Sequence, residues 1–302
     1  MISLNRNEFY EQEKAKRLFT AGPSSLVPES IEHLSGCFGR NDDAYNEMKK
    51  TTLNRLLEIS GQQRIAALQG SATLAIEIAV KNILAGDILI VQTGYYSERL
   101  KKICEAHLKK QDTKIDVVST NQIEQMEVGN YDWILACYTE TSVGYKNDIE
   151  ELKRLTRKSG AKLFLDATAS IGLETNHGIA DVVCFSSCKG LFAITGASFI
   201  AFKDDLSFNK VEPGYCNIET HLNGGVTGPY HQIQSLYGTL KLHEDLAECV
   251  RREKRSFMEK YKNCLKYPEQ NQPYLCTGIT KKLRYSEESI RYEPRGVEQM
   301  EV

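Results

Sequence analysis

The sequence predicts an α/β fold in which a mainly parallel, seven-stranded sheet carries helices on both faces. Short apolar runs alternate along the chain with longer amphipathic stretches, a pattern typical of strands joined by crossover helices. The chain has 302 residues, enough to bury a sizeable core, and it contains no internal repeat. We therefore expect a large domain over residues 1–245, with 1–17 as a polar lead-in, and a long helix with a small C-terminal unit over 246–302.

The individual elements follow in order. A turn-rich loop over Leu18–Ser25 precedes a helix from Glu29 and a second helical pattern from Met48 to Ile59. Apolar runs predict strands over Ile65–Leu68, Ile88–Gln92, Ile115–Ser119, Trp133–Tyr138, Lys162–Leu165 and Val182–Phe185, and helical stretches lie at Thr73–Leu84, from Ser97, and at Asn147–Lys158. Ala197–Phe202 follows too closely for a helical crossover and is predicted as the one antiparallel strand. One long helix from His231 to about Cys264 and a strand-like piece over Leu275–Leu283 complete the prediction.

Composition narrows the class of protein. Lys and Arg number 38 against 40 Asp and Glu, so nothing indicates a nucleic-acid or acidic membrane surface as partner. The nine cysteines lack CxxC spacing, and the histidines lack metal-ligand spacing, so we expect reduced thiols and no metal. The N-terminus has no apolar signal segment, and no run approaches the roughly 20 residues of a membrane span. We expect a soluble, cytoplasmic protein.

Two charged residues follow neighbouring strands of the predicted sheet. Asp166 ends the Lys162–Leu165 run, and Lys189 follows the Val182–Phe185 run. Parallel strands bring such residues to the carboxyl edge of the sheet, where α/β proteins bind ligands. The pair suits pyridoxal phosphate (PLP), because a lysine can hold its aldehyde as a Schiff base while a carboxylate keeps its ring nitrogen protonated. Taken singly, either residue could be solvated surface charge.

Three further strand ends reach the same edge, and each has a simpler alternative. Ser71, Ala72 and Thr73 start a helix and could bind a phosphate or serve as an ordinary N-cap. Tyr96 could stack on a flat ring or pack at the surface. Thr141 lies in a polar turn whose hydroxyls could bond the phenolic oxygen of the cofactor. Thr227 precedes the long helix and could be a simple helix-start hydroxyl.

Taken together, these residues resemble the class V aminotransferase branch of the fold-type I PLP enzymes. The resemblance covers about residues 18–245 and rests on seven segments: Thr20-Ala21-Gly22-Pro23, Asp43-Ala44-Tyr45-Asn46, Gln69-Gly70-Ser71-Ala72-Thr73, Gly94-Tyr95-Tyr96-Ser97-Glu98-Arg99, Thr139-Glu140-Thr141-Ser142-Val143-Gly144, Leu165-Asp166-Ala167 and Ser186-Ser187-Cys188-Lys189. It implies a fold-type I PLP-transferase fold, PLP as cofactor, and an abbreviated C-terminal small domain.

The resemblance also implies roles for single residues. Lys189 would be the Schiff-base lysine and proton shuttle, and Asp166 the partner of the pyridinium nitrogen. The cofactor would further contact Ser71, Ala72, Thr73, Tyr96, Thr141 and Ser187. Thr227 would reach the cofactor phosphate of the neighbouring subunit, which implies a homodimer with shared active sites. Gly22 would approach the substrate carboxylate through its backbone.

Two departures from the family pattern concern the substrate side of the site. Cys188 stands where the family usually has a polar side chain. Family members also continue past the end of this chain, where they carry the arginine that clamps the substrate carboxylate; Arg295, or Arg291, is the candidate here.

The expected activity is PLP-dependent transamination between a small amine or amino acid (2-aminoethylphosphonate-like, alanine or serine) and a 2-oxo acid such as pyruvate. One alternative is a cysteine desulfurase or lyase, which needs a late nucleophilic thiol such as Cys216, Cys249, Cys264 or Cys276. The other is a PLP-binding protein with a regulatory or assembly role.

Overall fold

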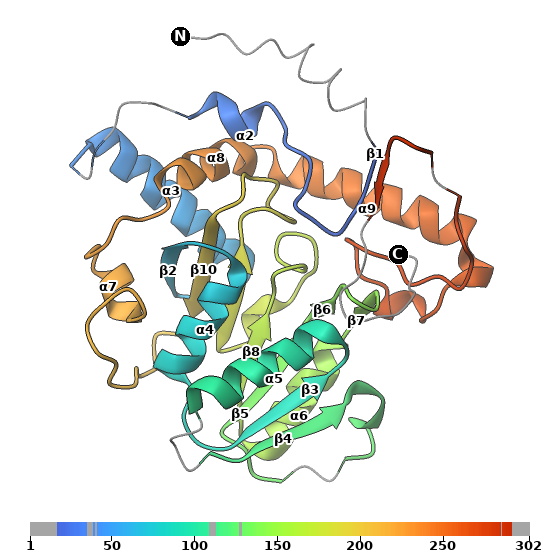
Figure 1. Cartoon of the computed structure of the whole chain (residues 1–302), viewed down its shortest axis with the longest axis horizontal. Helices are drawn as coiled ribbons and strands as arrows, with labels where there is room; N and C mark the ends of the chain where they lie inside the picture. Colours follow the sequence, from blue (N-terminus) through green and yellow to red (C-terminus); the bar gives the residue numbers. More distant parts are fainter. Residues whose placement is uncertain are drawn as a thin grey trace.

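A seven-stranded sheet forms the centre of the protein (Figure 1). The computed structural model describes residues 17–34, 39, 41–108, 113–126, 129–284 and 286–291. Across the sheet the strand order is β2-β10-β9-β8-β5-β3-β4. Their bounds are β2 Arg64–Gln69, β3 Ile88–Gln92, β4 Ile115–Ser119, β5 Trp133–Cys137, β8 Lys162–Asp166, β9 Val182–Ser186 and β10 Ala197–Phe202.

One strand of this sheet runs against the others. β10 pairs antiparallel with both β2 and β9, whereas β3·β4, β3·β5, β5·β8 and β8·β9 pair parallel. The short connection between β9 and β10 leaves no room for a crossover helix, so the chain has to return antiparallel. The mainly parallel sheet and its one antiparallel strand are both confirmed.

Alternate residues of the strands supply two separate cores. Leu89 and Val91 enter one core, which also holds apolar side chains of α3 (Asp43–Ser60), α6 (Ile149–Ser159) and α8 (Tyr230–Leu240). Ile88 and Ile90 enter the other, with α4 (Ala72–Ile83), α5 (Tyr95–Leu108) and α7 (Ile218–Leu222). Successive side chains of a strand point to opposite faces, so uniformly apolar strands require helices on both sides, as Figure 1 shows.

Local sequence signals place several helix ends. The Asp42 carboxylate accepts a hydrogen bond from Tyr45 N and starts α3, and the Asp148 carboxylate accepts from the first amides of α6. Gly61 and Gly160 end the same two helices with left-handed φ values of 63° and 72°. Such caps satisfy backbone groups that a helix end leaves unpaired.

The predicted helix from His231 to Cys264 is wrong, because the structure divides it. α8 ends at Leu240, and α9 spans His243–Lys260. The apolar residues of α8, Ile233 and Leu236, belong to the sheet core, whereas Ala247 of α9 packs with Leu173 and Phe192. One straight helix cannot bury side chains on two surfaces that face in different directions, so the chain bends between them.

The chain beyond α9 also differs from the prediction. Among the described residues of Leu275–Leu283 there is no strand, only an isolated bridge between Leu265 and Ile279. A parallel pair that the sequence did not indicate joins β1 (Arg17–Phe19) to β11 (Ser289–Arg291), side by side in Figure 1. The remaining elements are short: β6 Thr139–Glu140, β7 Tyr145–Lys146, α2 Glu29–Glu32, and 3₁₀ turns at Thr120–Gln122, His177–Ile179, Lys262–Cys264 and Glu269–Asn271.

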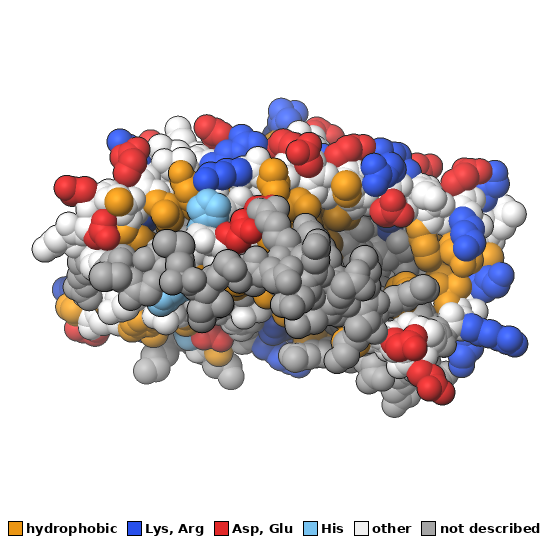
Figure 2. Space-filling view, turned by 90° about the horizontal axis from the view of Figure 1, so that it is seen from above, with side chains coloured by type: hydrophobic (Ala, Val, Ile, Leu, Met, Phe, Trp, Pro, Cys, Tyr) orange, Lys and Arg blue, Asp and Glu red, His pale blue; other side chains and the backbone are white. Residues whose placement is uncertain are grey.

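The surface carries charges of both signs. On the face seen in Figure 2, Lys and Arg side chains alternate with Asp and Glu, and neither sign dominates an area. None of the described helices combines the length and the apolar character that a membrane span needs.

Candidate active site

A small cavity at the carboxyl edge of the sheet brings Asp166 and Lys189 together; we call it the Lys189 cavity. Its other lining residues are Tyr96, Arg99, Thr139, Thr141, Thr168 and Ala169. These side chains lie at or after the carboxyl ends of β3, β5, β8 and β9, which meet at this edge. The structure therefore gathers four of the predicted cofactor residues, Tyr96, Thr141, Asp166 and Lys189, around one space.

Asp166 is buried, and its two carboxylate oxygens have different surroundings. Oδ1 accepts hydrogen bonds from Thr168 N at 2.9 Å and from Thr168 Oγ1 at 2.5 Å. Oδ2 lies 3.7 Å from Cys137 Sγ. Burial, and after it the Asp166 charge, holds the pKa of the Cys137 thiol well above its ordinary value. The Cys137 thiol therefore stays neutral, and Asp166 has no thiolate beside it. The hydrogen bonds from Thr168 fix the orientation of the Asp166 carboxylate.

The turn that carries Lys189 is held from three sides. Ser24 N donates to Cys188 O at 2.8 Å, and His243 Nε2 lies 3.0 Å from Gly190 O. The Ser187 hydroxyl donates to Ile194 O at 2.6 Å. Ser187 is fully buried, so its hydroxyl proton closes the loop after the lysine instead of entering the cavity.

Gly22 lies directly against the stem of Lys189. A Cβ placed on Gly22 would stand 2.8 Å from Lys189 Cγ, and the glycine has φ of +140°. Both the contact and the backbone conformation exclude a side chain here. The glycine thus lets the N-terminal loop cross the stem of Lys189; its predicted approach to the substrate carboxylate stays a prediction.

The start of α4 is the position at which the sequence predicts a phosphate cradle. Ser71 is the N-cap residue, yet its side chain makes no capping hydrogen bond within the described chain. α4 begins beyond the end of β2, and β2 and β9 flank the first residues of β10, so this helix end lies at the edge that carries Lys189. First-turn amides and the positive end of the helix dipole favour an anion at such a position.

Glu140 has a structural role that the sequence did not reveal. Its fully buried carboxylate accepts hydrogen bonds from Tyr96 N at 3.2 Å and Ser97 N at 2.9 Å, in the first turn of α5. Ser142 Oγ donates to the same carboxylate at 2.5 Å. Glu140 thereby joins the loop after β5 to the start of α5 and fixes the position of Tyr96. In the sequence, the only signal for this role of Glu140 is its place in the Thr139–Gly144 segment.

Arg99 is the second residue that the sequence reasoning missed. Its guanidinium lies over the ring of Tyr96, with the carbon Cζ 4.8 Å from the ring centroid, and it lines the Lys189 cavity. One turn of α5 separates the two residues, so both face the cavity from one helix. Arg99 belongs to the Gly94–Arg99 segment, which carries part of the family resemblance, but the sequence analysis predicted no role for this arginine.

Other predicted residues are not among the described lining of this cavity or are not described at all. Thr227 is exposed and does not line the Lys189 cavity of its own chain. Arg295 lies outside the described residues, and for Arg291 only the backbone, in β11, is described. Cys276, a candidate desulfurase nucleophile, is buried, and burial raises its thiol pKa to about 12, which disfavours a reactive thiolate. Cys216 and Cys249 are exposed.

Comparison with known proteins identifies the family. The family profile described as aminotransferase class-V matches residues 30–222. The chain belongs to the class V aminotransferase family. The resemblance inferred from the motifs is thereby confirmed, and this family implies PLP as cofactor.

Relatives with known names are distant in sequence. The 2-aminoethylphosphonate–pyruvate transaminase of Pseudomonas aeruginosa is 25% identical over 269 residues, which span 80% of this chain and 72% of that protein. A protein named 2-aminoethylphosphonate–pyruvate transaminase 2, from Burkholderia lata, is 26% identical over 201 residues, 62% of this chain and 53% of that protein.

Solved structures show the same fold. Pyridoxamine–pyruvate aminotransferase from Mesorhizobium loti superposes with a TM-score of 0.78 at 16% identity, covering 93% of this chain and 83% of that one. Aspartate aminotransferase from Thermus thermophilus gives 0.73 at 19% identity, covering 93% and 84%. The predicted fold-type I architecture is confirmed.

The residues of the Lys189 cavity fit PLP. Thr139 Oγ1 is buried in its lining, and within the described ranges it has no hydrogen-bond partner. A buried hydroxyl without a partner costs free energy, and a polar ligand in the cavity would remove that cost. The same cavity offers a carboxylate, an amine and an aromatic ring, the groups that recognise a pyridine aldehyde.

Proposed function

We propose that this class V aminotransferase uses PLP, held by the residues around Lys189, to move an amino group from a small amine or amino acid to a 2-oxo acid. The observation that carries the proposal is the shared cavity of Asp166 and Lys189, with Tyr96 beside them. The family supports the type of reaction and the cofactor.

Each residue of the cavity has a task in such a reaction. When bound, PLP supplies an electron sink for the carbon that bears the substrate amine. Asp166, oriented by Thr168, would hold the protonated ring nitrogen through its carboxylate. Tyr96 would orient the ring, and the first-turn amides of α4 would hold the phosphate. Lys189 Nζ takes a proton from the substrate carbon and returns a proton to the position that completes the transfer.

The substrates are proposed from the relatives. The curated relatives act, by their names, on 2-aminoethylphosphonate and pyruvate, so we propose a small amine that carries an acid group as donor and pyruvate or a similar oxo acid as acceptor. Alanine and serine are the other donors to test.

We further propose a domain division and a shared site between two copies of the chain. Residues 1–245 would form the cofactor-binding domain, and α9 would lead into a smaller unit over 246–302. Thr227 would reach the cofactor phosphate of a second subunit. Thr227 is exposed in the single chain and does not line the Lys189 cavity of that chain, and this position supports the arrangement.

Replacing Lys189 tests the proposed reaction. Lys189→Ala should remove the visible absorbance of the lysine-bound cofactor and lower turnover more than about a hundredfold, because it removes both the attachment point and the proton carrier. The measurements are absorption spectra of the PLP-loaded protein and conversion of PLP to its pyridoxamine form by candidate donors.

Lys210→Ala, at an exposed position, is the matched control and should leave both readouts unchanged. Full activity in Lys189→Ala would show that the assignment is wrong. A wild-type protein that binds PLP, yet whose absorbance no donor changes, would favour the regulatory alternative instead, and sulfide release from cysteine would favour a desulfurase.

A further inference from the structure

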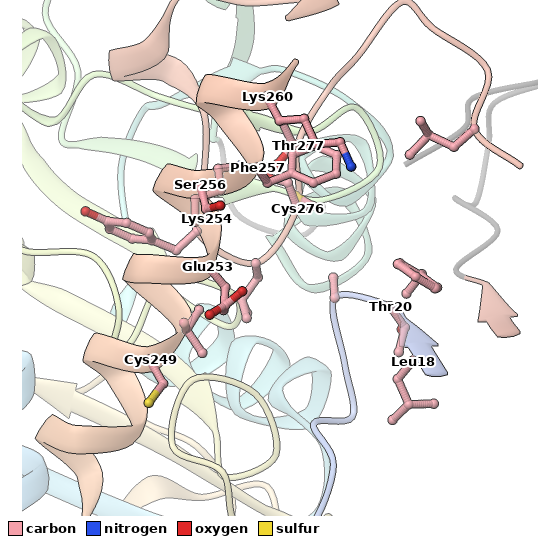
Figure 3. A pocket seen from close by; sticks show the side chains of 16 residues that line it. Leu18, Thr20, Cys249, Glu253, Lys254, Ser256, Phe257, Lys260, Cys276 and Thr277 are labelled. Carbon is pink, nitrogen blue, oxygen red and sulfur yellow. Dashed lines mark hydrogen bonds between the residues drawn. The ribbon is translucent and has the colours of Figure 1, made fainter. Parts of the chain in front are cut away.

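A second, larger cavity lies beside α9 and is distinct from the Lys189 cavity; we call it the α9 cavity. Its volume is about 580 Å³, within the range of small-molecule sites. Figure 3 shows Leu18 and Thr20 on one side and the labelled side chains of α9 on the other. Much of the lining is apolar, including Phe19, Val250 and Phe257.

Lys254 supplies a buried amine to this apolar lining. It is 5% exposed, and its Nζ donates to Cys276 O at 2.8 Å and to Thr277 Oγ1. Both acceptors are uncharged. An ammonium has three N–H donors, so these two contacts leave one donor for a ligand.

The charge of Lys254 has no direct counter-ion. No carboxylate in the described part of the chain lies within 4.0 Å of its amine. The charge of Glu174 raises the pKa of Lys254 slightly. The Glu174 carboxylate, however, accepts hydrogen bonds from Lys146 Nζ at 3.0 Å and from Tyr274 N at 2.9 Å. Burial lowers the pKa of Lys254 to about 8, so the amine is still mostly protonated at neutral pH. A buried, unpaired cation is costly, and an anion in the cavity would offset that cost.

The α9 cavity adjoins the proposed reacting centre. Ala21 lines it, and the next residue, Gly22, lies against the Lys189 stem. Cys276 also lines the α9 cavity. Burial raises the pKa of its thiol, and the charges of Lys254 and Lys189 both lower it by a smaller amount. A small molecule could therefore reach Lys254 with one end while its other end lies towards Lys189.

We infer that the α9 cavity binds the acid group of the substrate, a carboxylate or a phosphonate, with Lys254 as its cation. The inference rests on the proposed transamination, and it names the residue and the cavity that bind the acid group of the substrates. The apolar walls suit a short carbon chain between the two ends. A lysine on α9 would thus bind the acid group from within the described chain.

Unreactive acids test the binding without turnover. Propionate and methylphosphonate, which have no amine, would be titrated calorimetrically into the PLP-loaded protein, with uncharged propionamide as the matched ligand. We expect propionamide to bind at least about tenfold more weakly than the acids, because it lacks the charge-assisted contact. Equal affinity for propionate and propionamide, or no binding of either acid, would overturn the inference.

Variants locate the binding site. Lys254→Met should lower the affinity for both acids about tenfold or more and remove the preference over propionamide. Lys260→Met removes an exposed lysine from the same cavity and should change acid affinity less than about twofold. Should Lys254→Met fail to fold, Phe257→Trp, which fills the cavity, must weaken acid binding in its place. Unchanged affinity in a folded Lys254→Met protein contradicts the inference.

The test separates the two proposals. If no donor converts the cofactor while acids still bind in a Lys254-dependent way, the proposed reaction fails and the α9 cavity remains an acid site. If donors convert the cofactor normally in Lys254→Met, with an unchanged KM, the transamination stands and the assignment of Lys254 is wrong.

Discussion

Single buried residues already set much of the chemistry at this site. Asp166 lies between Cys137 and Cys184, and its charge adds to burial in raising the pKa of both thiols. Both neighbouring thiols therefore stay neutral, and Thr168 donates two hydrogen bonds to the carboxylate. A cofactor nitrogen that binds there would meet an acceptor of fixed orientation, with no thiolate beside it.

At the residue scale, His177 makes stability depend on pH. Burial lowers its pKa from 6.5 to about 4, and its ring lies 2.9 Å from Ser170 Oγ. The unfolded chain therefore binds more protons than the folded chain between these two values. The contribution of His177 to stability is complete above pH 6.5 and is lost as the pH falls towards 4. From pH 7 to pH 5 we expect a loss of about 2 kcal/mol, measured by urea unfolding.

His177→Asn should flatten this dependence, whereas exposed His107→Asn should leave it unchanged. His243, whose pKa burial also lowers, accounts for a remaining slope of the same sign. An identical pH dependence in His177→Asn and the wild-type protein would disprove the assignment.

At the scale of elements, Glu140 connects two segments that the sequence separates by more than forty residues. Its carboxylate accepts from the first amides of α5 and from Ser142, so the loop after β5 and the helix after β3 move as one unit. The tyrosine that would orient the cofactor is fixed by this connection and not by its own ring alone.

Glu140→Gln should therefore weaken cofactor binding. The amide keeps the size of the side chain but removes the negative charge from a helix N-terminus, so we expect a loss of about 1–2 kcal/mol in stability and about a tenfold rise in the Kd for PLP. Fluorescence titration with PLP and urea unfolding measure the two effects.

Asp148→Asn is the matched control for Glu140→Gln. Asp148 caps α6 in the same manner, through Glu150 N and Glu151 N, but neither of these residues lines the Lys189 cavity, whereas Glu140 holds Tyr96, which does. Asn can still cap the helix, so the loss of the charge should lower stability by at most about 1 kcal/mol, without changing the affinity for PLP. Equal PLP affinities in all three proteins would show that Glu140 is only structural.

At the scale of the whole molecule, the proposed homodimer predicts complementation between defective subunits. If Thr227 serves the partner's site, a mixture of Lys189→Ala and Thr227→Val chains forms some dimers with one doubly defective site and one intact site. Activity should then exceed that of either variant alone after the chains are mixed under dissociating conditions and reassociated.

The control for this experiment is a mixture of wild-type chains with chains that carry both substitutions. A mixed dimer of that kind has no intact site if Thr227 acts across the interface, whereas it keeps one intact site if Thr227 acts within its own chain, so a shared site predicts low activity for the isolated mixed dimer. No recovery in the first mixture, with dimers present by light scattering, would contradict a shared site.

The sequence by itself determined the sheet, its antiparallel strand and the strand ends that meet at Asp166 and Lys189. These features depend on short-range patterns: apolar runs need two covered faces, polar residues at strand ends share one edge, and capping residues stop helices locally. Tyr96 and Thr141 were found in the same way, because each directly follows a strand.

Only the tertiary structure decided the division between α8 and α9, the capping role of Glu140 and the position of Lys254. Each depends on which distant surface a segment meets: the sheet core for Ile233, the first turn of α5 for Glu140, and the carbonyl of Cys276 for Lys254. A local sequence pattern shows that a side chain will be buried, but not against what. Burial against a helix end or a neutral carbonyl gives a charged group its role, and that information exists only after the chain has folded.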